Sequence, residues 1–321
     1  MRNRELAGLL ALVLCLGGLL GCGDSDGDED APAPGVAEGE IRRDPANAGT
    51  AITVGSKDFT EQQVLGEIFG QALSAAGYRV SRAADQQSET LALRRLRSGA
   101  IDGYPEYTST ALVSFCDVDA RSIPMDPALA FRDARACLRR LGLRAFEPAP
   151  FTASFQVGVP ADTARELGLR TISDLVPHGQ DFVFYGTPEC RLRSDCLRGL
   201  RTVYGLRFRR FAGVDPVERH DVLNRRDDAV SIVYETDAQI RRENVVLLQD
   251  DRGMFPPYNS TFVMRADVAR AAGPELERVI AQVQRGLTDE VMQELNARVD
   301  IDGENPRDAA RSYLRQSGLV P

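Results

Sequence analysis

The hydrophobic and polar positions in the first half of the chain alternate between strand-like and helix-like patterns. A β-branched run at 51–55 predicts a strand, and apolar residues then recur on one helix face over 64–76, up to Gly77. Two more strands are predicted at 78–80 and 101–104, and two more helices at 88–98 and 126–141. Strands that alternate with helices in this way predict an α/β fold with a parallel sheet.

A second series of the same kind begins after Pro148-Ala149-Pro150. Its predicted strands are 155–159, 181–185, 229–234 and 245–248, and its predicted helices are 194–204 and 217–224. The stretch 250–258, rich in Pro, Gly and aromatic residues, is a poor helix or strand and is typical of a crossing segment.

Three helices are predicted in the tail, at 273–286, 288–298 and 306–316, the last opened by Asn305-Pro306. Two α/β blocks and a helical tail predict two lobes with a cleft between them. Ligands of open α/β sheets bind beyond the carboxyl ends of strands. The segments expected around the cleft therefore follow predicted strands, at 56–57, 104–112, 185–193 and 234–237.

The N-terminus reads as a targeting segment. A short basic start precedes an apolar run at 6–20, which is too short for a membrane span and suits a signal peptide over 1–21. Leu19-Leu20-Gly21-Cys22 resembles a bacterial lipobox, in which cleavage leaves a lipid-bearing Cys22. The alternative is an ordinary secretory signal followed by a chance cysteine. Residues 22–50 lack large apolar side chains almost entirely and predict an acidic, flexible tether.

The composition of the chain excludes some classes of function. The chain has 321 residues, is 43% hydrophobic and carries a net charge of −8. A mean hydropathy of −0.25 excludes a polytopic membrane protein, and the acidic balance argues against nucleic-acid binding. Much of the negative charge lies in 22–50, which has eight acidic residues against Arg42 and Arg43, so the body itself is only mildly acidic.

The cysteines favour disulfide bonds. With Cys15 in the signal peptide and Cys22 lipidated, four remain, and they are Cys116, Cys137, Cys190 and Cys196. An even number in an exported protein indicates disulfides, and three pairings are possible, of which the local one joins Cys116 to Cys137 and Cys190 to Cys196. A metal site is the alternative, but the chain has no C-x-x-C, and His178 and His220 lack ligand-like spacing. No metal or cofactor is predicted.

Catalytic motifs are missing from the sequence. G-x-G-x-x-G, the P-loop, H-E-x-x-H and G-x-S-x-G do not occur, and there are only two histidines. Carboxylate pairs such as Asp250-Asp251 and Asp227-Asp228 have the setting of solvated turns. The chain is therefore predicted not to be an enzyme.

A few side chains stand out as candidates for ligand binding. Lys57 is the only lysine among 39 basic residues and lies in the turn after the first predicted strand, where a compact ammonium differs from the guanidinium used elsewhere. Tyr234 and Tyr258 offer faces that attract quaternary ammonium, and Arg193 offers a fork for a carboxylate. The alternatives are a chance position for Lys57 and half-buried core positions for the tyrosines.

The body also carries a series of short motifs over about residues 52–318. They are GSKDFTEQ at 55–62 with LG at 65–66, IDGYPEYTST at 101–110, YGL at 204–206, YETD at 234–237, DD and FPPY within 250–258, and M and LN within 292–296. In this order they resemble the glycine betaine/choline-type substrate-binding proteins of ABC importers. The resemblance implies a two-lobed periplasmic-binding-protein fold of type II, with two chain crossings and a ligand cleft between the lobes. Lobe 1 would comprise 51–150 and 255–321, and lobe 2 would comprise 151–254.

The resemblance also implies roles for individual residues. Tyr234 and Tyr258 match members of an aromatic box around a trimethylammonium group, and Arg193 matches the arginine that takes the ligand's carboxylate. At two positions where the family often has an aromatic residue, this chain has Gln63 and Leu112, so half of the box is expected to be missing. The candidate ligand-binding residues are Tyr234, Tyr258, Arg193, Lys57, Gln63, Thr110 and Leu112.

The function implied by the resemblance is a lipid-anchored, extracytoplasmic monomer that delivers glycine betaine, choline or a related osmoprotectant to an ABC permease. The incomplete box motivates an alternative, in which the same fold binds a different amino acid or amine-containing metabolite. An enzyme or surface adaptor that uses this fold is the third hypothesis, and the missing catalytic motifs oppose the enzyme.

Overall fold

The computed structural model describes residues 40–83, 86, 88–215, 218–241 and 244–321. In these residues the body consists of two lobes, each built on a five-stranded sheet. The predicted signal peptide, Cys22 and residues 22–39 of the predicted tether lie outside the described residues.

The sheet of the first lobe has the strand order β2-β1-β3-β10-β4. Its strands are β1 Ala51–Val54, β2 Arg79–Arg82, β3 Gly103–Tyr107, β4 Leu143–Ala145 and β10 Ser260–Arg265. β1 runs parallel to β2 and β3, whereas β10 runs antiparallel to β3 and β4. Ser260 lies opposite Tyr107, so the carboxyl end of β3 meets the start of β10.

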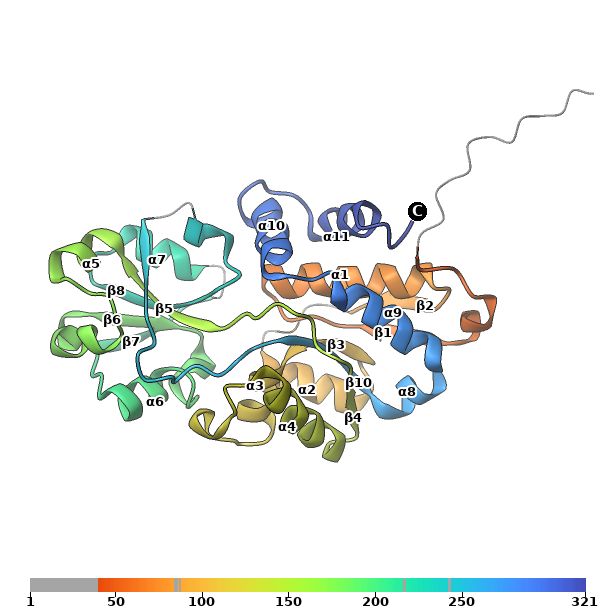
Figure 1. The fold of residues 1–321 in the computed structure, drawn as a ribbon, viewed down its shortest axis with the longest axis horizontal. Helices are drawn as coiled ribbons and strands as arrows, with labels where there is room; N and C mark the ends of the chain where they lie inside the picture. The colour runs from red at the N-terminus through yellow and green to blue at the C-terminus, as the bar shows by residue number, and fades with distance from the viewer. Residues whose placement is uncertain (1–39, 84–85, 87, 216–217, 242–243) are drawn as a thin grey trace, which may run out of the picture. The chain divides into compact units, whose positions relative to one another are not determined.

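Helices pack on both faces of this sheet, with α1 on one side and α2 and α4 on the other (Figure 1). They are α1 Thr60–Ala75, α2 Glu89–Ser98, α3 Thr108–Thr110, α4 Pro127–Arg140, α8 Ala266–Ala271, α9 Pro274–Arg285, α10 Asp289–Asp300 and α11 Pro306–Gln316. The apolar face predicted for α1 is buried, and the Phe69 ring packs at a tilt against that of Phe262 of β10, with ring centroids 4.6 Å apart. Each fully buried side chain of this size contributes about 1.5–3 kcal/mol, so α1 anchors the lobe.

The sheet of the second lobe has the order β7-β6-β8-β5-β9. Its strands are β5 Phe155–Pro160, β6 Val183–Gly186, β7 Arg210–Gly213, β8 Ala229–Tyr234 and β9 Val245–Leu248, and its helices include α5 Ala161–Leu167, α6 Leu197–Gly199 and α7 Arg219–Arg225. β6 runs parallel to β7 and β8, and β5 runs antiparallel to β8 and β9.

The prediction of a parallel sheet is therefore wrong for part of each lobe. β5 and β10 enter their sheets from the opposite lobe, which makes them antiparallel to the neighbouring strands. β4, β7 and β10 were not predicted, because β4 has three residues, β7 is a half-exposed edge strand, and β10 directly follows the proline-rich crossing. The helix expected at 194–204 starts only at Leu197, since the preceding residues form a loop closed by a disulfide.

Two chain segments run side by side between the lobes. One precedes β5 and the other precedes β10, and Figure 1 shows both of them passing between the sheets. They are held together by backbone hydrogen bonds from Ala153 N to Tyr258 O at 3.2 Å and from Ala149 N to Ser260 O at 2.8 Å. This pair of crossings is the covalent connection about which the lobes meet.

Residues 40–50, assigned from the sequence to the flexible tether, pack on the first lobe. Ile41 is 3% exposed, and its backbone N donates to Leu319 O at 2.9 Å. Gly77 has a φ of +101°, and a Cβ there would lie 2.5 Å from Asp44 O. The glycine that ends α1 thus also admits the N-terminal segment, which places the start of the body near residue 40 rather than 51.

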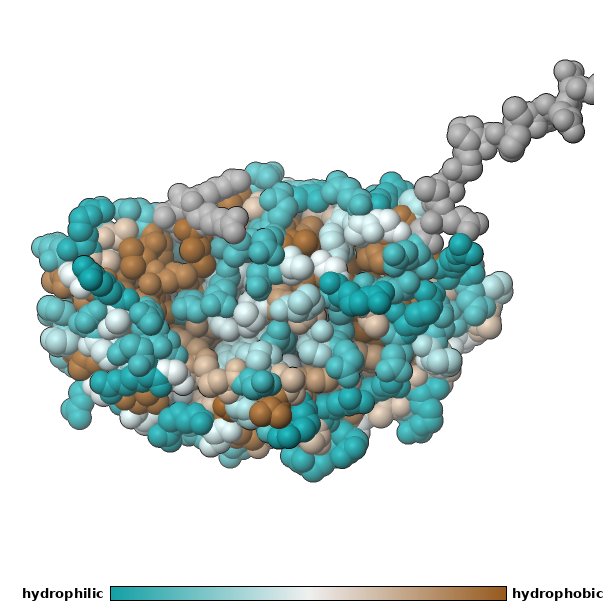
Figure 2. Space-filling view, in the orientation of Figure 1, coloured by the Kyte–Doolittle hydropathy of each residue, from teal (hydrophilic) through white to brown (hydrophobic). Residues whose placement is uncertain are grey.

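The surface is mostly hydrophilic in the view of Figure 2, with hydrophobic residues gathered over one side of the second lobe. Within the described ranges, the large hydrophobic side chains that are exposed are Met125, Leu129, Leu167 and Leu192. None of the helices that the structure describes combines the length and the apolar character that crossing a membrane requires.

Candidate functional site

A cavity lies between the two lobes, where the carboxyl ends of strands from both sheets converge. The first lobe contributes residues that follow β1 and β3 and the start of α2, and the second contributes residues that follow β6, β7 and β8. The charged side chains that line it are Lys57, Asp58, Glu89, Glu189, Arg193, Asp215 and Arg219. The aromatic side chains that line it are Phe59, Tyr107, Phe155, Tyr234 and Tyr258.

Three of the aromatic rings form a stack. Phe155 lies between Tyr258, with ring centroids 4.8 Å apart and planes 16° apart, and Tyr234, at 5.4 Å. The β5–β8 register places Phe155 directly opposite Tyr234, and the second crossing brings Tyr258 to the other side of the Phe155 ring. Sheet pairing and the crossing together therefore build an aromatic wall from positions more than 20 residues apart.

Phe59 and Tyr107 extend the wall from the first lobe. The Phe59 ring lies 5.9 Å from that of Tyr234. The Tyr107 hydroxyl donates to Glu61 Oε1 at 2.5 Å, behind the cavity. Burial raises the pKa of Glu61, and burial followed by the charge of Glu61 raises that of Tyr107, so the phenol keeps its proton.

Lys57 follows β1 and is fixed by a buried acid. Its Nζ lies 2.6 Å from Glu106 Oε1, and Glu106 is fully buried. Glu106 also accepts from Tyr104 Oη at 2.7 Å and from the backbone N of Tyr107 at 2.8 Å. The ammonium lies 4.9 Å from the centroid of the Tyr107 ring, within the range of a cation–π contact.

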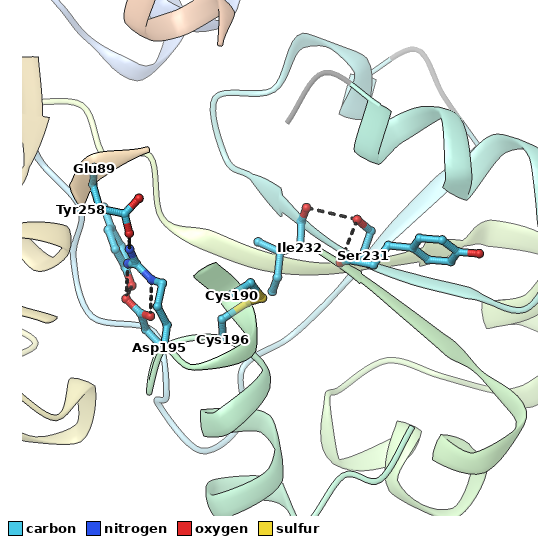
Figure 3. The surroundings of a disulfide bond; sticks show 9 residues. Glu89, Cys190, Asp195, Cys196, Ser231, Ile232 and Tyr258 are labelled. Carbon is cyan, nitrogen blue, oxygen red and sulfur yellow. Dashed lines mark hydrogen bonds and ion pairs between the residues drawn. A yellow bond between two sulfur atoms is a disulfide. The ribbon is translucent and has the colours of Figure 1, made fainter. Parts of the chain in front are cut away.

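Arg193 follows β6 in a loop that the Cys190–Cys196 disulfide closes. Its Nε and Nη2 donate to the two carboxylate oxygens of Asp195, at 2.8 and 2.6 Å. The Tyr258 hydroxyl donates to Asp195 Oδ2 at 2.5 Å. Figure 3 shows Asp195, Tyr258 and Glu89 clustered on one side of this disulfide. A bidentate pair of this kind fixes the guanidinium plane.

Glu89 reaches the same arginine from the other lobe. Its Oε1 accepts from Arg193 Nη1 at 2.7 Å and from Ser114 Oγ at 3.0 Å. Burial alone would raise the pKa of Glu89, but the positive charges of Arg193 and Lys57 lower it to about 2. The side chain is therefore a carboxylate inside the cavity, tied to the opposite lobe.

Arg219, the first residue of α7, forms a third cation–acid pair. Its guanidinium is hydrogen-bonded to both oxygens of Asp237 and lies 4.2 Å from the Tyr234 ring centroid. Asp237 also lies 2.9 Å from His220 Nε2 and accepts from the backbone N of Tyr234 at 2.8 Å. Burial opposes ionisation of Asp237, but Arg219 and His220 lower its pKa to about 2.

The cavity lining includes five of the seven ligand-binding candidates proposed from the sequence, which are Lys57, Thr110, Arg193, Tyr234 and Tyr258. Gln63 and Leu112 lie elsewhere. Gln63 is on α1, and Leu112, 3% exposed, packs with Ile123 and Cys137 in a small apolar cluster. Thr108–Thr110 and Ala111–Phe115 are helical, and residues two apart on a helix do not share a face, so Leu112 and Thr110 point to different sides.

Other lining residues were missed. Phe59 lies in the motif at 55–62 and Tyr107 in the motif at 101–110. Their neighbours Lys57 and Thr110 were candidates, so the same motifs could have indicated Phe59 and Tyr107. Phe155 was assigned to a strand without a role in the cavity. Glu89 and Arg219 gave no signal in the sequence, because each depends on a partner brought near by the fold.

The four remaining cysteines form the local pairs. Cys116 is bonded to Cys137, with Cα atoms 6.4 Å apart, and Cys190 to Cys196, with Cα atoms 5.2 Å apart. Within the part of the chain that the structure describes, no group of three or more His, Cys, Asp or Glu side chains is arranged to hold a metal ion.

Comparisons with known proteins agree with this geometry. Residues 50–316 match the family model described as the substrate-binding domain of the ABC-type glycine betaine transport system. The chain is 30% identical over 299 residues to a glycine-betaine-binding protein of Pseudomonas aeruginosa, covering 90% of this chain and 91% of that protein. It is 27% identical to an ergothioneine transport permease/ergothioneine binding protein, EgtU, of Helicobacter pylori, covering 84% of this chain and 48% of that protein.

A solved structure described as a glycine betaine/carnitine/choline ABC transporter has the same fold. It superposes with a TM-score of 0.67 at 22% identity, covering 84% of this chain and all of that one. The predicted two-lobed α/β fold of the periplasmic-binding-protein type is thereby confirmed.

Proposed function

Because the chain belongs to the family of substrate-binding domains of ABC-type glycine betaine transport systems, we propose that it captures a small quaternary amine in the cavity between its lobes. As a member of this family it is a substrate-binding protein of an ABC importer and not an enzyme. The proposal extends to the ligand itself, which we expect to carry a trimethylammonium group, as glycine betaine and choline do.

The observation that carries this proposal is the aromatic wall. Phe155 is stacked between Tyr234 and Tyr258, and Phe59 and Tyr107 line the same cavity from the other lobe. Each ring face that meets a quaternary ammonium contributes roughly 0.5–2 kcal/mol. Phe59 and Tyr107 add aromatic lining from the first lobe, and Phe155 holds Tyr234 and Tyr258 in place by stacking between them.

Closure of the lobes on the ligand is the expected mode of capture. Side chains of both lobes line the cavity, and the two crossings provide a short connection about which the lobes can move. A ligand that contacts both lobes stabilises the closed form by its differential affinity for that form. We propose that the permease then receives the ligand from this closed form.

A second ligand class has support from one feature of the cavity. Beyond the aromatic wall, Asp215 and Arg219 offer polar groups that a trimethylammonium with a short tail does not use. A larger betaine with a polar ring would reach them, and one relative is named for ergothioneine. This keeps an amine-containing metabolite other than an osmoprotectant as the alternative.

The lipid anchor is also part of the proposal. Cys22 follows a signal-like segment, and its lipidation would hold the body at a membrane on the extracytoplasmic side, in the periplasm or at the cell surface. Membrane fractionation of cells that express the wild type and Cys22→Ser tests this. We expect the serine variant to appear in the soluble fraction, and an unchanged membrane fraction would remove the anchor from the proposal.

Titration calorimetry with choline, glycine betaine, carnitine and ergothioneine tests the ligand class. We expect heat of binding with at least one of the four. Phe155→Leu should weaken it by about tenfold, because Tyr234 and Tyr258 lose the ring that is stacked between them while apolar volume is kept. Phe211→Leu is the matched control, since Phe211 is a half-buried residue on the edge strand β7 and does not line the cavity. Absence of binding with all four ligands at millimolar concentration would refute the quaternary amine.

A further inference from the structure

The cavity contains a carboxylate that the sequence did not suggest. Glu89 is the first residue of α2, whose N-cap Ser88 accepts from Leu91 N at 3.3 Å. The helix start directs Glu89 into the cavity, where its side chain is 13% exposed. A carboxylate this well buried must be held by specific partners.

The partner of Glu89 is the arginine that a ligand carboxylate would need. Asp195 occupies one edge of the Arg193 guanidinium through Nε and Nη2, and Glu89 and Ser114 occupy Nη1 at 2.7 and 3.0 Å. A carboxylate ligand can form a comparable pair with Arg193 only if Glu89 withdraws. Glu89 thus fills the anion position from within the protein.

The other cations of the cavity are paired in the same way. Lys57 is held by Glu106, and Arg219 by Asp237. Behind each lining cation there is thus a buried carboxylate, and further carboxylates line the cavity itself, at Asp58, Glu89, Glu189 and Asp215. The carboxylates in and behind the cavity wall outnumber its cations. This excess of negative charge attracts a cationic ligand and repels an added carboxylate.

We propose that Glu89 makes this site selective for quaternary ammonium ions that lack a carboxylate, such as choline, over zwitterions such as glycine betaine. This inference rests on the proposed function and names the charge type of its ligand. A cation in the aromatic wall adds a favourable charge next to Glu89. A zwitterion brings a third carboxylate to a guanidinium that already has two, those of Asp195 and Glu89.

Glu89 stays ionised under ordinary conditions, so the selection does not depend on pH near neutrality. The opposite charges of Arg193 and Lys57 keep its pKa at about 2 against the effect of burial. The tie is also an inter-lobe contact, since α2 belongs to the first lobe and Arg193 to the second. A cation can bind without breaking that contact, whereas a zwitterion has to replace it.

The experiment compares choline with glycine betaine, which share the trimethylammonium group and differ at the other end. Calorimetry on the full mature chain gives a dissociation constant for each ligand with wild type, Glu89→Gln, Glu89→Asp and Glu147→Gln. Glu147 is 71% exposed and pairs with Arg135 outside the cavity, so its variant controls for the same change of charge. Melting temperatures confirm that each variant is folded.

We expect wild type to bind choline more tightly than glycine betaine. Glu89→Gln should shift the ratio of the two constants toward glycine betaine by at least about tenfold, the effect of one charge-assisted hydrogen bond. Glu89→Asp, which keeps the charge, and Glu147→Gln should retain the choline preference.

A wild type that prefers glycine betaine would overturn the inference, and so would a ratio that Glu89→Gln leaves unchanged; in both cases the quaternary amine proposal survives. If the Glu89 variants do not fold, the wild-type ratio alone decides. If neither ligand binds to any folded variant, the inference fails, and the titrations with carnitine and ergothioneine decide whether its premise fails with it.

Discussion

The two lobes have the same sheet topology, and each places one cation after its first parallel strand. β1 and β6 both lie between two parallel neighbours, and β10 and β5 hold equivalent antiparallel positions. Lys57 follows β1 and Arg193 follows β6. The pairing differs, because the acid on Lys57 comes from β3 of its own lobe, whereas Arg193 takes Glu89 from the other lobe as well. One cation is fixed within a lobe and the other joins the lobes.

The segments that carry the two cations are also held differently. The turn at Lys57 is held by backbone pairing with Gln86, through Asp58 N to Gln86 O at 3.0 Å and Gln86 N to Ser56 O at 2.8 Å. The loop at Arg193 has no such ladder among its described residues and is closed instead by the Cys190–Cys196 disulfide. The first cation thus depends on the sheet, and the second on a covalent bond.

The largest expected effects come from removing either of the two cations. Lys57→Met leaves Glu106 fully buried without its counter-charge, which should lower the free energy of unfolding by about 3–5 kcal/mol. Arg193→Met should cost at least as much, because it leaves Asp195, which is also fully buried, with only the Tyr258 hydroxyl and takes the counter-charge of Glu89 as well. Urea unfolding at pH 7 measures both losses.

A double variant checks the cause of that loss. Lys57→Met combined with Glu106→Gln removes the buried charge and should recover most of the stability. If the double variant is as unstable as Lys57→Met, the loss of stability does not come from the carboxylate of Glu106 left without its counter-charge.

The two disulfides give a comparison with effects of intermediate size. Cys116 and Cys137 are 21 residues apart and Cys190 and Cys196 are 6 apart. Replacing each pair by serine should cost about 3 kcal/mol for the longer loop and about 2 kcal/mol for the shorter one. Ligand affinity should follow the opposite order and fall about tenfold only for the shorter loop, which positions Arg193.

Thermal unfolding and calorimetry on the two serine variants measure these effects. Equal affinities for both variants would show that Arg193 is positioned by Asp195 and Tyr258 without help from the disulfide.

The same comparison shows which residues of the site could be predicted from the sequence and which could not. Lys57, Arg193, Tyr234 and Tyr258 were identified because each follows a strand or a recognisable motif. Phe155 was assigned to a strand, but its place beside Tyr234 needs the antiparallel register, which a local pattern does not contain. Glu89 is 104 residues from Arg193 along the chain, and only the closed arrangement of the lobes makes it part of the site.

Leu112 shows a different limit of local reasoning. It follows Thr110 by two residues, and Thr110 lines the cavity. The chain is helical from Thr108 to Phe115, and residues two apart on a helix do not share a face, so Leu112 packs in the cluster with Cys137. Motif position alone therefore misplaces the side chain, although the motif itself leads to the site.

The smallest expected effect is the response of ligand binding to mild acid. A carboxyl group with a lowered pKa adds stability that is complete above its unfolded value of 4.5 and is lost as the pH falls toward about 2. The Glu89–Arg193 tie between the lobes should therefore be unchanged from pH 7 to pH 5, and choline affinity should vary by less than about twofold over that range. Calorimetry at pH 7, 6 and 5 measures this. A larger fall over this range would show that a group other than Glu89 governs the inter-lobe site.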